Sequence, residues 1–254
     1  MIIKENVYRL YPNLGYWLML FIPLTFSGFY FTYFSQLRLP LPSVMHMHFI
    51  LMGLWMATVI AQALLIRFNK PQLHKKIGRL SYILVPLVVL STWAMMRYSF
   101  AAQTEALTGD ISLGIAGVTL EQGRVEIASF MSIAFVYLFW LVLFFGLAVW
   151  FRKNSSIHAR FMIAAALTFI GPTIDRTLIF GFDLYNLGPG LPIEVVGFAL
   201  INLILIFLLF KDIKGGKSLM PYSFALGIYI LFQFLHLTMT HNSVWESIVR
   251  TLLS

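Results

Sequence analysis

Seven long apolar stretches constrain what this chain can fold into. Each approaches the roughly 20 mostly apolar residues that a membrane-spanning helix needs. Because a bilayer interior offers the backbone no hydrogen-bond partners, such stretches cross it as helices. They cover residues 16–34, 44–66, 77–96, 127–151, 161–180, 193–210 and 219–236. The sequence therefore predicts an all-α fold, a polytopic bundle of seven transmembrane helices.

The composition supports a membrane protein. The chain of 254 residues is 59% hydrophobic and only 11% charged, whereas soluble domains are about 45–50% apolar and about 25% charged. A water-soluble globule is therefore excluded. The chain has no cysteine, which excludes disulfides, iron–sulfur clusters, thiolate zinc sites and cysteine nucleophiles. No soluble segment remains for a second domain, so residues 1–254 are expected to form one integral-membrane domain.

The distribution of charge predicts the orientation. With the N-terminus in the cytoplasm and the connections alternating, the cytoplasmic segments hold 13 of the 18 basic residues and two of the 10 acids. This asymmetry follows the positive-inside rule. We therefore expect a cytoplasmic N-terminus and an outside C-terminus in a bacterial cytoplasmic membrane. The net charge of +8 is then explained by topology and contact with anionic lipids on the cytoplasmic face, and no nucleic-acid partner is expected.

One connection, residues 97–126, is long. It lies on the outer side, and Gly109, Gly114, Gly117 and Gly123 punctuate a mildly apolar stretch within it. Such a segment is either a lid over the bundle or a plain surface loop. We favour the plain loop.

Four of the six histidines fall near the outer face. His46 and His48 open the second span, His236 ends the seventh, and His241 follows it. If these two helices are neighbours, their imidazoles can serve as axial ligands of a b-type haem, with His48 and His236 the deeper pair. His46, His48 and His241 are also a candidate set for zinc or copper. The alternative is that these rings hydrogen-bond to water, lipid or backbone at the interface.

The remaining two histidines lie at the start of predicted spans, at the inner face. His74 and His158 each stand on a basic connection just before a helix. They can act as plain interfacial anchors for anionic lipid headgroups. Alternatively, they pair with each other, or bind one anionic ligand such as a quinone carbonyl or a phosphate, and both are candidate cofactor-binding residues.

A third group of polar residues is a candidate path through the membrane. Gln62 lies late in the second span, and Asp175 and Arg176 lie near the outer end of the fifth. Ionisable groups at membrane depth are costly and therefore mark functional sites. Pro172 precedes them and is expected to loosen the helix.

Two blocks of residues carry a resemblance to a family. The first block comprises His48, Trp55, Gln62, Leu65 and the run His-Lys-Lys-Ile-Gly-Arg at 74–79. The second comprises His158, Ala159, Arg160, Phe161, Met162, Gly171, Pro172 and Arg176. Together they resemble the signatures of a family of bacterial polytopic membrane proteins of uncharacterised activity.

The resemblance covers 45–176, about half of the chain. Ala159 replaces a residue that is usually basic, and Asp175 stands where a small residue is common. The resemblance implies that His48, Gln62, His74, His158 and Arg176 are the polar marks of the family. It supplies no activity.

Three classes of function remain. The preferred one is a haem- or metal-linked redox membrane protein, with His48 as a ligand and haem b or a His-bound transition metal as cofactor. The second is a small-solute or proton transporter whose path is lined by Gln62, Asp175 and Arg176. The third is a non-catalytic assembly subunit that binds a membrane partner or a second copy of the chain. The sequence leaves open whether the protein is an enzyme.

Overall fold

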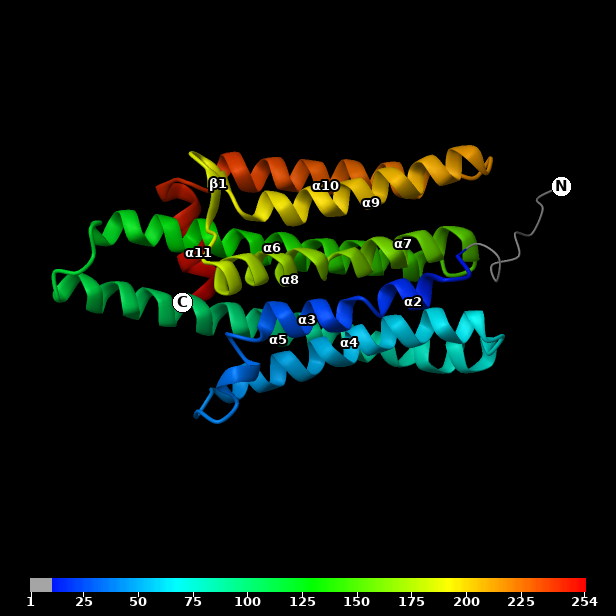
Figure 1. The fold of residues 1–254 in the computed structure, drawn as a ribbon, viewed down its shortest axis with the longest axis horizontal. Helices are drawn as coiled ribbons and strands as arrows, with labels where there is room; N and C mark the ends of the chain where they lie inside the picture. The colour runs from blue at the N-terminus through cyan, green and yellow to red at the C-terminus, as the bar shows by residue number, and fades with distance from the viewer. Residues whose placement is uncertain (1–10) are drawn as a thin grey trace.

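The chain folds into an elongated bundle whose helices run side by side (Figure 1). The computed structural model describes residues 11–254; Lys4, Glu5 and Arg9, counted above on the cytoplasmic side, lie outside the described residues. Six described segments are helical, long and apolar enough to cross a membrane. They are α4 (Ser43–Arg67), α5 (Pro71–Ser112), α6 (Leu120–Trp150), the segment Ser155–Gly181, α9 (Glu194–Lys214) and α10 (Met220–Met239). The predicted all-α, multi-pass membrane architecture is confirmed at this level.

The structure divides the first predicted span, 16–34, into two short helices. These are α2 (Leu14–Leu18) and α3 (Phe21–Phe29). Pro23 explains the break, because proline has no N–H to donate to the carbonyl four residues earlier. That carbonyl belongs to Met19, which instead accepts a hydrogen bond at 3.0 Å from the N–H of Ile22, three residues later.

The fifth predicted span is broken in the same way. It consists of α7 (Ser155–Leu167), α8 (Ile170–Arg176) and a π-helical turn, Thr177–Gly181. Pro172 stands four residues after Thr168, where α7 ends, as the sequence predicts. This segment is the central helix of the bundle, because 67% of its apolar window is buried against 17–39% for the other five.

The broken helices pack closely on each other. A Cβ added to Gly28 on α3 would lie 2.5 Å from the backbone oxygen of Thr173 on α8. The contact therefore requires glycine, since the backbone of α8 cannot move aside. This packing fixes α3 against the half of the central helix that carries Asp175.

The prediction of a long loop over 97–126 is wrong. The helix predicted for 77–96 extends in α5 from Pro71 to Ser112, and α6 begins at Leu120, before the predicted residue 127. The segment is rich in strong helix formers such as Ala, Gln and Glu, and Thr119 forms a capping box with Gln122. Hydropathy identifies where a helix meets lipid, and this helical hairpin continues beyond the apolar band.

Three smaller elements complete the chain. The strands β1 (Asn186–Gly188) and β2 (Leu191–Pro192) form an antiparallel hairpin before α9. The last helix, α11 (Ser243–Leu253), buries Val249 and Leu253 against the extended parts of α5 and α6. A separate and larger core lies among the membrane helices, where Trp55, Trp140 and Phe144 are fully buried.

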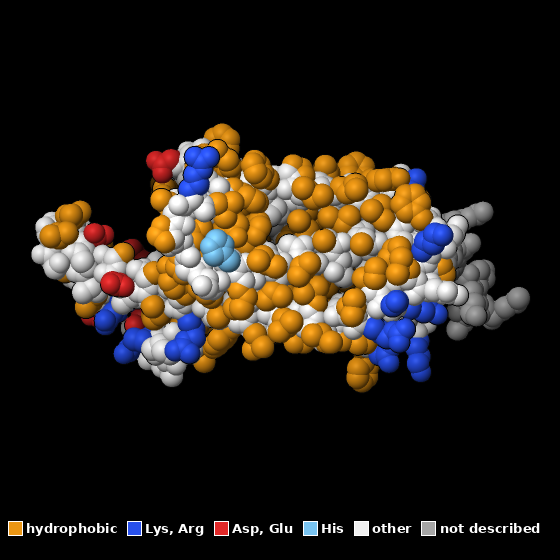
Figure 2. All heavy atoms as spheres, turned by 90° about the horizontal axis from the view of Figure 1, so that it is seen from below, with side chains coloured by type: hydrophobic (Ala, Val, Ile, Leu, Met, Phe, Trp, Pro, Cys, Tyr) orange, Lys and Arg blue, Asp and Glu red, His pale blue; other side chains and the backbone are white. Residues whose placement is uncertain are grey.

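The two ends of the bundle differ in charge. The end that holds the connections 68–70, 151–154 and 215–219 is called the basic end. The opposite end, which holds the β-hairpin, α11 and the α5–α6 extension, is called the acidic end. A broad band of apolar side chains separates them on the face in Figure 2, where blue side chains lie at both ends and red ones are seen only at the acidic end. Such a band flanked by charge is what a bilayer requires.

Candidate functional site

The four histidines expected at the outer face all lie at the acidic end, each against a different hydroxyl. His46 Nδ1 lies 2.9 Å from Tyr33 Oη, and His48 Nδ1 lies 3.3 Å from Ser91 Oγ. His236 Nδ1 lies 2.5 Å from Ser132 Oγ, and His241 Nε2 lies 3.1 Å from Ser129 Oγ. Within residues 11–254 no three His, Cys, Asp or Glu side chains are grouped to hold a metal ion. The structure therefore does not bring together the predicted set His46, His48 and His241.

The predicted haem pair is also separated by packing. His48 on α4 faces α5 through Ser91, whereas His236 on α10 faces α6 through Ser132 and packs edge-on against Phe198 at 5.9 Å. The helices α4 and α10 are not among the closely packed helix pairs. In the described part of the chain these two imidazoles do not face each other across a common haem-binding slot.

The two histidines at the basic end do meet. The ring centroids of His74 and His158 are 6.4 Å apart, with the ring planes at 88°. His74 belongs to the first turns of α5 and His158 to the first turns of α7, so this contact joins the α4–α5 hairpin to the α6–α7 hairpin. Asn154 caps α7 by accepting a hydrogen bond from the Ile157 N–H at 3.2 Å.

One nitrogen of each ring is held by its own hairpin. His158 Nδ1 donates to the carbonyl of Ala148 at 2.8 Å, and His74 Nδ1 donates to the carbonyl of Gln62 at 3.4 Å. Because Nδ1 carries the proton in both rings, Nε2 keeps its lone pair in the neutral form. Within residues 11–254 neither Nε2 atom makes a hydrogen bond. Histidines that bind metals commonly show this arrangement, with one nitrogen donating to a carbonyl and the other facing the ion.

Gln62 completes this end of the bundle. Its Nε2 donates to the backbone carbonyl of His74 at 3.1 Å, and its own carbonyl accepts from the His74 ring. Its Oε1 is buried and has no hydrogen-bond partner within residues 11–254. A buried acceptor of this kind calls for a donor such as water or a ligand.

Asp175 lies far from Gln62, on the central helix in the acidic half of the bundle. The side chain is only 6% exposed, and its Oδ2 accepts a hydrogen bond from Tyr137 Oη at 2.7 Å. Its Oδ1 is buried without a partner in the described residues. The carboxyl therefore has one oxygen satisfied and one unsatisfied, at a depth where either charge or an unpaired polar atom is costly.

Arg176 turns away from Asp175 toward α3. Its Nη1 donates to Thr32 Oγ1 at 3.5 Å, and its guanidinium lies 5.1 Å from the ring centroid of Phe29 and 5.8 Å from that of Phe180. The structure therefore does not bring together Gln62, Asp175 and Arg176, the three residues of the predicted path. Their side chains face three different parts of the bundle.

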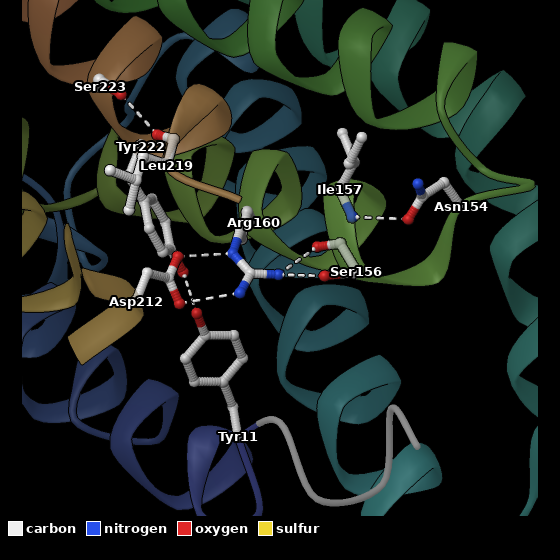
Figure 3. A network of polar contacts seen from close by, with 9 residues as sticks. All are labelled: Tyr11, Asn154, Ser156, Ile157, Arg160, Asp212, Leu219, Tyr222 and Ser223. Carbon is white, nitrogen blue, oxygen red and sulfur yellow. Dashed lines mark hydrogen bonds and ion pairs between the residues drawn. The ribbon is translucent and has the colours of Figure 1, made fainter. Parts of the chain in front are cut away.

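One polar cluster was not predicted as a site. Arg160 on α7 is fully buried and binds Asp212 on α9 through two hydrogen bonds, with Ser156 and the rings of Tyr11 and Tyr222 around it (Figure 3). Tyr222 Oη donates to Tyr11 Oη at 2.9 Å. From the sequence, both charges belong to cytoplasmic connections and Arg160 also to the second block of the resemblance, and the two are not paired with each other. The signal that was available is that Asp212 is an isolated acid among lysines.

Comparison with known proteins adds no relatives: no protein-family model, no curated protein and no solved structure matches this chain.

Proposed function

We propose that this chain is a redox-linked membrane protein whose cofactor, a transition metal or a haem, is bound by His74 and His158. The observation that carries the proposal is the geometry of this pair. Both rings are fixed through Nδ1 to backbone carbonyls of different hairpins, and both Nε2 atoms are available. Imidazole is a good ligand for iron, copper, nickel and zinc.

The separation of the rings allows one ion between them where the two Nε2 atoms face it from opposite sides. Bonds of about 2.0–2.1 Å from each imidazole nitrogen to a metal, added to the two ring radii, span a distance close to the 6.4 Å between the centroids. A haem between the same rings would also need a flat slot to separate the hairpins. A metal ion is therefore the simpler occupant, and Gln62 Oε1 offers a third ligand atom, an oxygen, close to His74.

This proposal places the cofactor ligands at the basic end, whereas the sequence favours a ligand at the acidic end. His48, which the sequence favours as a ligand, is engaged with Ser91, and His236 with Ser132. The family resemblance includes His74, His158 and Gln62 among its polar marks, so the three residues that meet in space are three of the five that the resemblance implies.

The test is an absorption spectrum of the detergent-purified protein together with elemental analysis of the same sample. We expect either a stoichiometric metal or a haem absorption band that sharpens on reduction. The signal should be lost in His74→Ala and in His158→Ala and kept in the matched variant His46→Ala, which removes an imidazole at the opposite end. A folded, colourless and metal-free protein after supplementation with iron, copper and haem would overturn the proposal.

We further propose that the chain crosses the membrane seven times, with the basic end in the cytoplasm of a bacterial cell. The support for a seventh crossing is that the α2–α3 segment follows α4 along its length. Asn13 accepts a hydrogen bond from Arg67 at the end of α4, and Tyr33 contacts His46 at its start. Seven crossings place the C-terminus outside, and the lysines of the basic end would then contact anionic lipid headgroups.

A further inference from the structure

The acidic half of the bundle holds a second site, built around Asp175. Two glycines make room for it. A Cβ on Gly171 would lie 2.0 Å from Tyr137 Oη, and a Cβ on Gly197 of α9 would lie 2.9 Å from Asp175 Oδ1. Any larger residue at either position would displace the Tyr137–Asp175 pair. The two glycines therefore let Tyr137 and Asp175 pack directly against the backbones of α8 and α9, with the unsatisfied oxygen facing Gly197.

The carboxyl of Asp175 has no ion-pair partner within residues 11–254. Glu194 from α9 and Arg176 from α8 act on the carboxyl electrostatically, and Tyr137 from α6 donates to it. The third neighbouring helix, α3, carries no titratable side chain. Arg176 is the cationic side chain that acts on Asp175, and its guanidinium is directed toward Thr32 and Phe29. A proton bound at Asp175 would remove the buried charge.

A chain of polar groups leads from the site to the acidic end. Glu194 lies in the first turn of α9, its Oε2 is buried without a partner within residues 11–254, and His241 acts on it electrostatically. His241 is exposed and bonds Ser129 Oγ, which lies 2.9 Å from Thr240 Oγ1. Polar side chains therefore continue from solvent to the neighbourhood of the carboxyl.

The side of Asp175 toward the basic end is different. The interior there is filled by large buried rings and aliphatic side chains, among them Phe144, Phe198 and Leu205, with Trp140 packed between Tyr137 and Phe198. The layer separates Asp175 from the Arg160–Asp212 pair and from the His74–His158 pair. This layer also holds the hydrogen-bonded pair Asn202–Gln233, which within residues 11–254 makes no hydrogen bond to Asp175.

We propose that Asp175 is a proton-binding group that exchanges a proton with water at the acidic end by way of Glu194. Tyr137 occupies Oδ2, so the proton is taken up at Oδ1: an O–H bond forms there as the O–H bond of protonated Glu194 breaks. The Glu194 carboxylate then takes a proton from hydronium, which leaves as water, and release is the reverse. A buried carboxyl on a broken central helix, open to one face, is the arrangement that proton-linked transporters use. The inference is independent of the cofactor proposed for His74 and His158.

The test is infrared difference spectroscopy of the full chain in lipid, recorded between two pH values and in D2O. We expect the carbonyl band of a protonated carboxylic acid that shifts in D2O and changes with the pH of the medium. The band should be lost in Asp175→Asn and shifted in Tyr137→Phe. It should be unchanged in the matched control Asp183→Asn, which alters an exposed aspartate eight residues further along the chain.

Glu194→Gln tests the route, and we expect proton exchange at Asp175 to slow by at least tenfold. If Asp175→Asn fails to fold, the Tyr137→Phe shift still decides the question, because that hydroxyl makes the hydrogen bond recorded for Oδ2. Carboxyl spectra that are identical in the wild type, Asp175→Asn and Tyr137→Phe would overturn the proposal. A band that never changes with pH would overturn it as well.

Discussion

Arg160 on α7 and Asp212 on α9 form a two-pronged ion pair inside the bundle, with Nε to Oδ2 at 2.7 Å and Nη2 to Oδ1 at 2.8 Å. Arg160 also donates to the backbone carbonyl of Ser156 at 3.0 Å. The guanidinium is thereby joined to its own helix and to a second one. The pair fastens the central helix to α9 at the basic end, where the Tyr11–Tyr222 hydrogen bond closes over it.

Removing one partner of this pair should be strongly destabilising. Asp212→Ala leaves a buried guanidinium without its counter-charge, and such changes cost about 3–5 kcal/mol. We expect a lower thermal unfolding temperature in detergent. The matched control is Lys214→Ala, an exposed charge two residues away, which should change the unfolding temperature little. If Asp212→Ala and Lys214→Ala unfold alike, the pair does not stabilise the protein.

Two glycines in membrane helices should respond oppositely to alanine. Gly28→Ala places a methyl group 2.5 Å from a backbone oxygen of α8, and we expect a loss of about 1–3 kcal/mol from overpacking. Gly146→Ala meets nothing within 4 Å and should add about 0.4–1 kcal/mol through reduced freedom of the unfolded chain. Thermal unfolding of the two variants, side by side, measures the difference. Equal effects would mean that α3 does not approach α8 this closely.

The absence of cysteine makes the topology directly testable. Thr108→Cys places a thiol on the exposed part of the α5 extension, and Lys153→Cys places one in the α6–α7 connection. A membrane-impermeant maleimide should label the first in intact cells and the second only after permeabilisation. The cysteine-free parent is the blank. The reverse pattern would invert the proposed orientation, and labelling of both in intact cells would rule out a barrier between the two ends.

Gln62 should act on the cofactor through His74. Because its side chain and its carbonyl both bond His74, Gln62→Ala loosens the ring, and we expect metal affinity to fall about 10–100-fold, the usual effect of losing such a supporting contact. The folded yield should change little. Gln103→Ala, which removes a helix-surface amide on the α5 extension, is the control. Unchanged metal affinity in Gln62→Ala would separate Gln62 from the histidine site.

The apolar spans and the charge asymmetry could be predicted because both depend on local composition. A helix that meets lipid must be apolar over about 20 residues wherever it lies in the bundle. Pro172 likewise predicts the loosened central helix from a missing N–H alone. The same reasoning failed at 97–126, since that segment is helical through propensity, capping and packing against α11, none of which hydropathy reports.

Which polar groups meet was decided by the tertiary structure. The sequence shows six histidines near membrane faces, and helix rotation determines that His74 meets His158 while His48 and His236 each face a serine. Arg160 and Asp212 are separated by 52 positions in the chain, so no local pattern marks their pairing. Burial and partnership depend on which faces of neighbouring helices pack together, and side-chain packing of the whole bundle sets those faces. The sequence by itself determined that this is a multi-pass helical membrane protein with one basic end, because those properties are sums over local segments.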